Sequence, residues 1–288
     1  MIKHLKLFRH TRNNAVHLAF TRADGTTADL GPASHGRLTG LLEASDPVAA
    51  LEDLAGSHAM EADPAALQLL PPIEDHEVWA AGVTYLRSKS ARMDESDFSA
   101  SAYDRVYEAE RPELFFKSLP RKVIGPGKPV GIRSDSRWNV PEPELALVLN
   151  SRGTLVAYTI GNDMSSRDIE GSNLLYLPQA KIYSGSCALG PCLVLGGTEA
   201  EARDWTINLE IQRNRTSVFH GQTSVGLIKR SFADLIEYLF RCQSFPHGAV
   251  LLTGTGIVPP NDFSLAQGDV VHISISGIGT LENPVVQV

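Results

Sequence analysis

The stretch Val140-Pro141-Glu142-Pro143-Glu144-Leu145-Ala146-Leu147-Val148-Leu149 sets two carboxylates two residues apart at the start of an apolar run. Successive residues of a strand point to opposite faces, so Glu142 and Glu144 are predicted to project together. Like charges this close repel unless a cation or a shared proton compensates them. A hard divalent ion such as Mg²⁺ is one compensation. A solvated pair at the strand entrance is the alternative.

The composition limits the class of protein. The chain has 288 residues, of which 43% are hydrophobic and 20% charged, as is ordinary for a globular protein with a sizeable core. The net charge of −7 and the lack of a basic block argue against nucleic acid and anionic membranes as partners. No stretch approaches the roughly 18 apolar residues of a membrane span. The N-terminus also lacks the apolar core of a signal peptide, so we expect a cytoplasmic protein.

Pro71-Pro72 marks the predicted boundary between two domains. Residues 1–71 are predicted to form a small α+β domain, with strands around an Asn13-Asn14 turn and a helical stripe over 36–56. Residues 72–288 alternate short apolar runs with Gly, Pro and Asn, which indicates a strand-rich catalytic domain. Its strands are expected at 114–117, 144–149, 154–161, 192–196, 205–213, 216–219, 249–252 and 269–276. One helix is predicted after Ser231, whose side chain caps it.

Other chemistry-bearing side chains flank the opening stretch. Asp163 stands at the end of an apolar strand, where side chains often converge on a site. Lys181 lies among mostly uncharged residues, and is either a snorkelling surface residue or an ammonium held near anions. Glu113 precedes the apolar run Leu114-Phe115-Phe116, where burial would raise its pKa toward an acid–base value. The polar segment 87–111 is typical of either a lid or a plain pair of surface helices.

Taken together, these motifs resemble the fumarylacetoacetate hydrolase superfamily over about residues 75–288. The resemblance rests on Glu142-x-Glu144-Leu145-Ala146, Gly161-Asn162-Asp163-x-Ser165-x-Arg167-Asp168, Lys181, Leu252-Thr253-Gly254-Thr255-Gly256 and Gly277-x-Gly279-x-Leu281-x-Asn283. It implies a mostly β, α+β fold with a mixed β-roll catalytic domain, assembled as a homodimer or homotetramer. It also implies Mg²⁺, with Mn²⁺ as the alternative, bound by Glu142, Glu144 and Asp163. Arg167 and Asp168 are expected to form a buried structural pair.

The chain departs from the water-activating members of that family. Those members carry a Gly-x-Asn-Tyr-x-x-His-x-x-Glu segment, whose His–Glu pair acts as a general base on water. Here Ser88 and Ala91 stand at the positions of that His and Glu. The departure removes the expected base for hydrolytic C–C cleavage and favours loss of water.

Residues 103–113, 140–144 and 162–171 resemble one branch of the family, the 2-keto-3-deoxypentonate dehydratases. This implies a small-molecule 2-oxo acid substrate, dehydrated to 2,5-dioxopentanoate, with Glu113 and Lys181 as catalytic residues. We expect Glu113 to be the acid–base residue, and Lys181 either to supply positive charge near the developing enolate or to take part in proton transfer. Further substrate contacts are expected from Arg87, Ser88, Lys117, Ser165 and Thr255. The alternatives are a 2,4-diketo acid hydrolase, an oxaloacetate decarboxylase or keto–enol tautomerase, and a binding protein that keeps a keto-acid pocket without catalysis.

Overall fold

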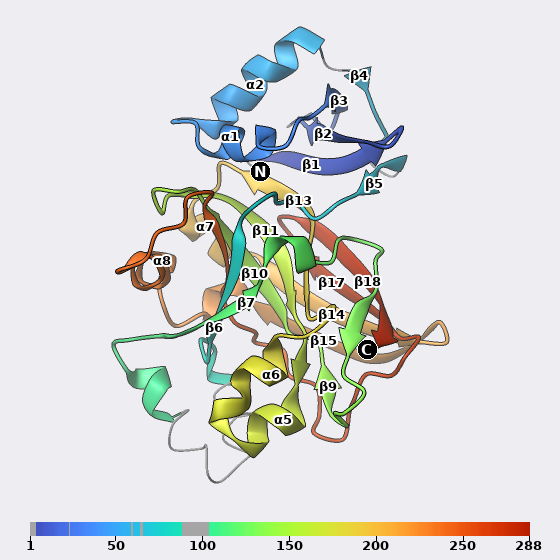
Figure 1. Ribbon diagram of the computed structural model, residues 1–288, viewed down its shortest axis with the longest axis vertical. Coiled ribbons are helices and arrows are strands. Elements are labelled where there is room, and N and C mark those ends of the chain that lie inside the picture. Colours follow the sequence, from blue (N-terminus) through green and yellow to red (C-terminus); the bar gives the residue numbers. More distant parts are fainter. Residues whose placement is uncertain (1–3, 23, 59, 64–65, 88–103) are drawn as a thin grey trace.

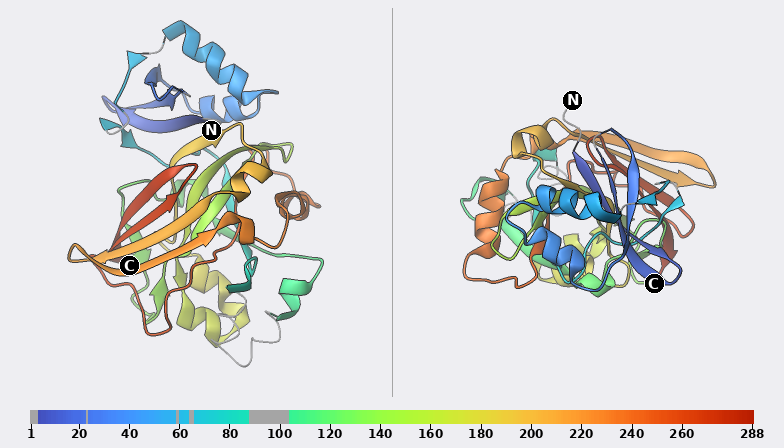
Figure 2. Two further views of the ribbon diagram at one scale, coloured as in Figure 1. Left: turned by 180° about the vertical axis from the view of Figure 1, so that it is seen from behind. Right: turned by 90° about the horizontal axis from the view of Figure 1, so that it is seen from above.

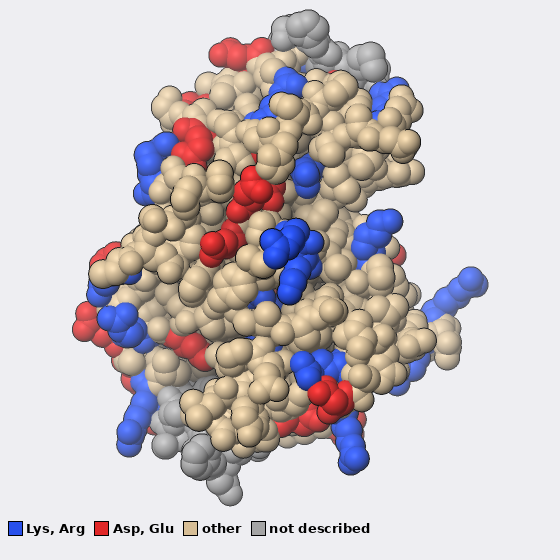
Figure 3. Space-filling view, viewed as in Figure 1, with Lys and Arg blue, Asp and Glu red and all other residues tan. Residues whose placement is uncertain are grey.

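The computed structural model describes residues 4–22, 24–58, 60–63, 66–87 and 104–288 (Figure 1). These residues form a mostly β structure with short helices, which confirms the predicted fold class. Among the described helices, none is both long and apolar enough to cross a membrane. Figure 3 shows Lys and Arg interspersed with Asp and Glu over one face of the molecule.

The larger sheet has eleven strands within the described residues and is centred on β10 (Pro143–Leu149). All seven residues of β10 are buried, because β11 (Leu155–Asp163) and β16 (Ala249–Leu252) flank it and both its faces are covered. A strand buried on both faces is a continuous apolar run rather than an alternating one. The other strands are β4 (Met60–Glu61), β3 (Thr27–Pro32), β2 (Ala15–Thr21), β1 (Leu5–Arg12) and β13 (Cys187–Leu195) on one side, β6 (Glu77–Gly82) and β7 (Glu113–Ser118) on the other, and β5 (Gln68–Leu69) beside β1.

A second, five-stranded sheet covers one face of β10 in the described structure. Its order is β15 (Thr216–Ser224), β14 (Thr206–Arg213), β17 (Val270–Ile275), β18 (Gly279–Gln287) and β8 (Val130–Ile132). Alternate residues of β10 enter two different cores, as strand geometry requires. Leu145 and Leu147 belong to the cluster that includes the second sheet, whereas Ala146 and Val148 join the cluster that includes the N-terminal helices. A two-stranded piece, β9 (Asn139–Val140) with β12 (Ser165–Ser166), lies near the start of β10 and the end of β11.

The helices follow the sequence signals with one correction. The stripe over 36–56 forms two helices rather than one, α1 (Arg37–Leu42) and α2 (Pro47–His58). Asp46 Oδ1 accepts hydrogen bonds from the backbone N–H groups of Val48 and Ala49 in the first turn of α2. Pro47 suits the first helical position, so a new helix begins there. As predicted, Ser231 caps α8 (Phe232–Phe240) through the N–H of Asp234. The remaining elements are α5 (Arg167–Ser172), α6 (Leu177–Lys181), α7 (Glu199–Arg203), η2 (Pro120–Lys122), η3 (Leu174–Tyr176) and η4 (Val225–Leu227).

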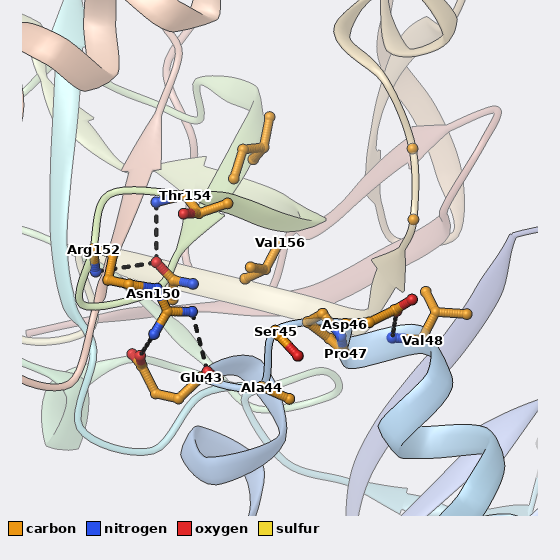
Figure 4. A pocket seen from close by; sticks show the side chains of 13 residues that line it. Glu43, Ala44, Ser45, Asp46, Pro47, Val48, Asn150, Arg152, Thr154 and Val156 are labelled. Carbon is orange, nitrogen blue, oxygen red and sulfur yellow. Dashed lines mark hydrogen bonds and ion pairs between the residues drawn. The ribbon is translucent and has the colours of Figure 1, made fainter.

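The N-terminal strands extend the larger sheet across the boundary expected at Pro71. β1 pairs with β13 from Leu5 opposite Leu195 to Leu7 opposite Leu193. Figure 2 shows from behind that the N-terminal unit covers one end of the larger domain. A cavity of about 580 Å³ lies at this junction (Figure 4). At its edge the Glu43 carboxylate accepts hydrogen bonds from the N–H of Ser151 at 2.6 Å and from Arg152 at 3.0 Å.

Leu147 tests the central position of β10, because it is fully buried opposite Tyr158 and Leu251. Leu147→Ala leaves a cavity, so the free energy of unfolding should fall by about 2–5 kcal/mol. Urea unfolding followed by circular dichroism measures this change. Val218→Ala, at a side chain that is 41% exposed on β15, should change the same quantity by less than about 0.5 kcal/mol. Equal losses in the two variants would contradict the buried position of Leu147.

Candidate active site

Three carboxylates converge where β10 begins and β11 ends. Glu142 precedes β10, Glu144 is its second residue, and Asp163 is the last residue of β11. One oxygen of each lies within 4.8 Å of the others. The side chains are nearly inaccessible, at 3%, 1% and 1% exposure. The structure therefore brings together the three residues that the sequence predicts as metal ligands.

Burial makes this cluster electrostatically demanding. It raises the pKa of Glu144 well above its ordinary value, and the charges of Asp163 and Glu142 raise that pKa further. The charge of Lys181 acts in the opposite direction, as does the N–H of Gly254, which donates to Glu144 Oε2 at 2.5 Å. Since buried carboxylates are costly without compensation, the cluster requires positive charge nearby.

Three buried cations touch the cluster directly, and Lys181 and Arg167 are two of them. Lys181, the last residue of α6, donates to Glu142 Oε2 at 2.7 Å and to Asp163 Oδ2 at 3.0 Å. Its third contact is Ser165 Oγ at 2.6 Å. Arg167 forms an ion pair with Glu142 Oε1 at 2.8 Å. Of the two alternatives for Lys181, the structure thus shows an ammonium held near anions.

Lys117 is the third of these buried cations. It is fully buried, and its ammonium forms an ion pair with Asp163 Oδ1. It also donates to the carbonyl oxygens of Met164 and Lys181. An ammonium has three donors, and these three contacts use them. In this structure Lys117 thus holds Asp163 and two backbone carbonyls, and the expected substrate contact stays a prediction.

The expected buried pair of Arg167 and Asp168 is wrong. Arg167 is buried and turns toward Glu142. Asp168 instead accepts hydrogen bonds from Ser136 Oγ at 2.6 Å and from the N–H of Arg137 at 2.8 Å. Adjacent residues at the start of a helix do not face each other, so one side chain points into the site and the other points away.

A small cavity adjoins the carboxylates. Its lining is Ala81, Gly82, Glu113, Phe115, Glu142, Glu144, Asp163, Glu170, Lys181, Gly254 and Thr255. The open space of about 20 Å³ is enough for one water molecule or ion. Glu113 enters from the first position of β7 and packs on Gly82, where any Cβ would collide with its carboxylate. Both predicted catalytic residues, Glu113 and Lys181, therefore line the same cavity as the carboxylates.

The other expected substrate contacts have different positions. Thr255 lines the cavity, and its Oγ1 hydrogen-bonds to the backbone of Ile257. Ser165 accepts from Lys181 and donates to the carbonyl of Asp163 at 3.0 Å, so it orients these two groups. Arg87 is exposed and is not part of the cavity lining. Ser88 lies outside the described residues.

Residues 104–111, the described end of the segment expected as a lid, are hydrogen-bonded to the residues just before α8. Lys229 Nζ donates to the carbonyl of Tyr107 at 2.8 Å. Arg230 donates to the carbonyls of Ala109 and Glu110. Residues 88–103 of the expected lid lie outside the described residues.

Sequence reasoning gave no role to Glu170, Phe115 or Gly82, which also line the cavity. Glu170 follows Arg167 by three residues in α5, and residues three apart share a helix face, so this spacing was a usable signal. The ring centre of Phe115 lies 5.7 Å from Lys181 Nζ, a distance suited to a cation–π contact. Gly82 stands at the glycine of the Gly-x-Asn-Tyr segment compared above, although the sequence assigned it no role of its own.

The donor set fits a hard divalent ion. All three groups offer carboxylate oxygen, the ligand type that suits Mg²⁺ and Mn²⁺. Lys181 bridges Glu142 and Asp163, which shows that a cation is favourable between them. Glu142, Glu144 and Asp163 are therefore the residues that would hold such an ion.

Comparisons with known proteins agree with this site. Residues 77–286 match the family described as fumarylacetoacetate (FAA) hydrolase C-terminal. A probable 2-keto-3-deoxyxylonate dehydratase of Haloferax volcanii is 46% identical over 217 residues, 75% of this chain and 74% of that protein. The 2-dehydro-3-deoxy-D-arabinonate dehydratase of Saccharolobus solfataricus is 41% identical over 222 residues, 76% of this chain and 74% of that protein. A solved 2-keto-3-deoxy-D-arabinonate dehydratase complexed with magnesium and 2,5-dioxopentanoate superposes with TM-score 0.82 and 34% identity, over 98% of this chain and 99% of that chain.

Glu144→Gln tests the metal site, because the amide keeps the size of the side chain and removes its charge. Mutation of a residue that only hydrogen-bonds to a metal ligand typically lowers metal affinity by about 10–100-fold. Loss of a ligand itself should cost more, so we expect Mg²⁺ binding to weaken by at least about 100-fold. Isothermal titration calorimetry measures the affinity. Glu237→Gln, at an exposed carboxylate on α8, is the matched control and should leave the affinity unchanged. Wild-type affinity in Glu144→Gln would exclude this residue as a ligand.

Proposed function

The chain belongs to the fumarylacetoacetate hydrolase family, and we propose that it is a Mg²⁺-dependent dehydratase that converts a 2-keto-3-deoxypentonate into 2,5-dioxopentanoate. The observation that carries this proposal is the cavity in which Glu113 and Lys181 face three clustered carboxylates. The two relatives described above are named as dehydratases of such acids, and the similar solved structure holds magnesium with 2,5-dioxopentanoate.

The carboxylates and the ammonium prepare the site for a 2-oxo acid. Glu142, Glu144 and Asp163 would hold Mg²⁺, which would supply Lewis-acid polarisation of the substrate's C2 carbonyl. Loss of the C3 proton then leaves negative charge on the carbonyl oxygen. Once its contacts with Glu142 and Asp163 are shared with the ion, Lys181 offers N–H groups and positive charge to that oxygen.

Glu113 is the group that we assign to proton transfer. It reaches the cavity from β7, whereas the three metal ligands come from β10, β11 and the residue before β10. Glu113 accepts the C3 proton or delivers a proton to the C4 hydroxyl, which leaves as water. Tautomerisation of the dehydrated acid gives 2,5-dioxopentanoate.

The lining of the cavity favours loss of water over hydrolysis. A hydrolase of 2,4-diketo acids needs a base that activates water, and a His–Glu pair is the family's usual base. Among the described residues that line the cavity, none is a histidine. The expected assembly as a homodimer or homotetramer and the expected cytoplasmic location remain predictions of this proposal.

A coupled assay tests the reaction and the role of Glu113 together. With 2-keto-3-deoxypentonate and Mg²⁺, the wild type should form 2,5-dioxopentanoate, detected by an NAD(P)-dependent aldehyde dehydrogenase. Glu113→Gln should lower kcat by about 10²–10⁴-fold, because an amide does not transfer the proton, with Mg²⁺ affinity retained. Glu110→Gln, at an exposed carboxylate that accepts from the Tyr238 hydroxyl, should keep the wild-type kcat. If the protein forms pyruvate from a 2,4-diketo acid but no 2,5-dioxopentanoate from the pentonate, the proposed dehydratase activity is refuted.

Gly82→Ala tests the position of Glu113 without changing its chemistry. The added methyl group collides with the Glu113 carboxylate, which must then shift. A displacement of about 1 Å costs up to roughly 10²-fold in rate, so we expect kcat to fall on that scale while Mg²⁺ affinity stays constant. Gly40→Ala in α1, where a Cβ would meet nothing within 4 Å, is the matched control. Unchanged turnover in Gly82→Ala would show that Glu113 acts from another position.

A further inference from the structure

A second group of ligand-type side chains lies in the N-terminal strands, outside the active site. His10 on β1, His17 on β2 and Asp29 on β3 each offer one atom, and these atoms lie within 4.8 Å of one another. All three residues are buried, with 1%, 8% and 2% exposure. Strand register explains the meeting, because His10 and His17 are direct partners across β1 and β2.

The distances suit a tetrahedral ion. His17 Nδ1 lies 3.1 Å from Asp29 Oδ1, and His10 Nε2 lies 3.7 Å from the same oxygen. Zinc bonds to nitrogen and carboxylate oxygen of about 2.0–2.1 Å place neighbouring ligand atoms about 3.4 Å apart. The two observed separations bracket this value, and the third, between the two histidines, is within 4.8 Å.

His10 supplies the second observation. Its Nε2 is buried and has no hydrogen-bond partner among the described residues, although it points toward Asp29. A buried polar nitrogen in that state is unfavourable, and an ion would satisfy it.

The surroundings provide access and an open position. His17 and Asp29 line a cavity of about 610 Å³, which Arg12 and Arg37 also line. Arg12 donates to Asp29 Oδ2 at 3.2 Å, but its side chain is 50% exposed and has room to turn into water. Asp29 keeps the N–H of Gly31 at 2.8 Å as a second anchor.

We propose that His10, His17 and Asp29 form a second metal site of the zinc type, with its fourth position open to this cavity. Two imidazoles favour Zn²⁺ and similar ions over Mg²⁺, so the site differs in selectivity from the three carboxylates. An ion there links β1, β2 and β3, the strands that extend the larger sheet beyond β13.

Cobalt is the probe that separates the two sites, because tetrahedral Co²⁺ absorbs visible light far more strongly than octahedral Co²⁺ in an all-oxygen site. The wild type titrated with Co²⁺ should develop the strong bands at one equivalent, and Zn²⁺ should abolish them. Glu144→Gln should keep the bands, whereas His10→Gln should lose them and bind Zn²⁺ at least tenfold more weakly in equilibrium dialysis. His35→Gln, at an exposed histidine paired with Asp75, is the matched control and should behave as the wild type.

Two outcomes overturn the proposal. A wild type that shows only the weak octahedral spectrum contains a hydrogen-bonded His–Asp cluster and no second metal site, and this measurement does not depend on the folding of any variant. Strong bands that vanish in Glu144→Gln and persist in His10→Gln assign the tetrahedral ion to the carboxylate site instead.

Discussion

The burial of three carboxylates within 4.8 Å of one another is the constraint that organises this molecule. Bringing such charges out of water costs far more than a hydrophobic contact returns, unless each charge is paired and hydrogen-bonded. Lys117, Lys181 and Arg167 supply three buried positive charges, so the six groups balance when all are ionised. Removing one cation would leave a buried charge without compensation.

The same cations also fix the backbone around the site. Lys117 donates to the carbonyls of Met164 and Lys181, and thereby joins the turn after β11 to the end of α6. On the other side, the loop after β16 is held by Glu144, which accepts from the N–H of Gly254, and by Leu145, whose carbonyl accepts from Thr253. The same network of contacts thus compensates the buried charges and holds the backbone, so residues from four distant segments stay together at the site.

The sequence predicts those parts of the fold that depend on local pattern. The apolar run of β10, the Ser231 cap of α8 and the convergence of Glu142 with Glu144 all follow from spacing along one segment. The direction of Arg167 and the burial of Lys117 depend instead on which segments meet in space. A lysine in a strand has the same local pattern whether its ammonium reaches a substrate or a carboxylate behind it.

Charge also connects the geometry to the reaction. With a divalent ion added, the six balanced groups carry an excess of two positive charges, and a bound 2-oxo acid carboxylate offsets one of them. In the proposed mechanism, transfer of the C3 proton to Glu113 would neutralise the Glu113 carboxylate and move its negative charge to the substrate's carbonyl oxygen, beside the remaining positive charge. The positive charge therefore stabilises the substrate more strongly as its C3 proton leaves than before. An interaction that is stronger in the transition state than in the ground state accelerates the reaction. Loss of the C4 hydroxyl as water then needs only a proton donor.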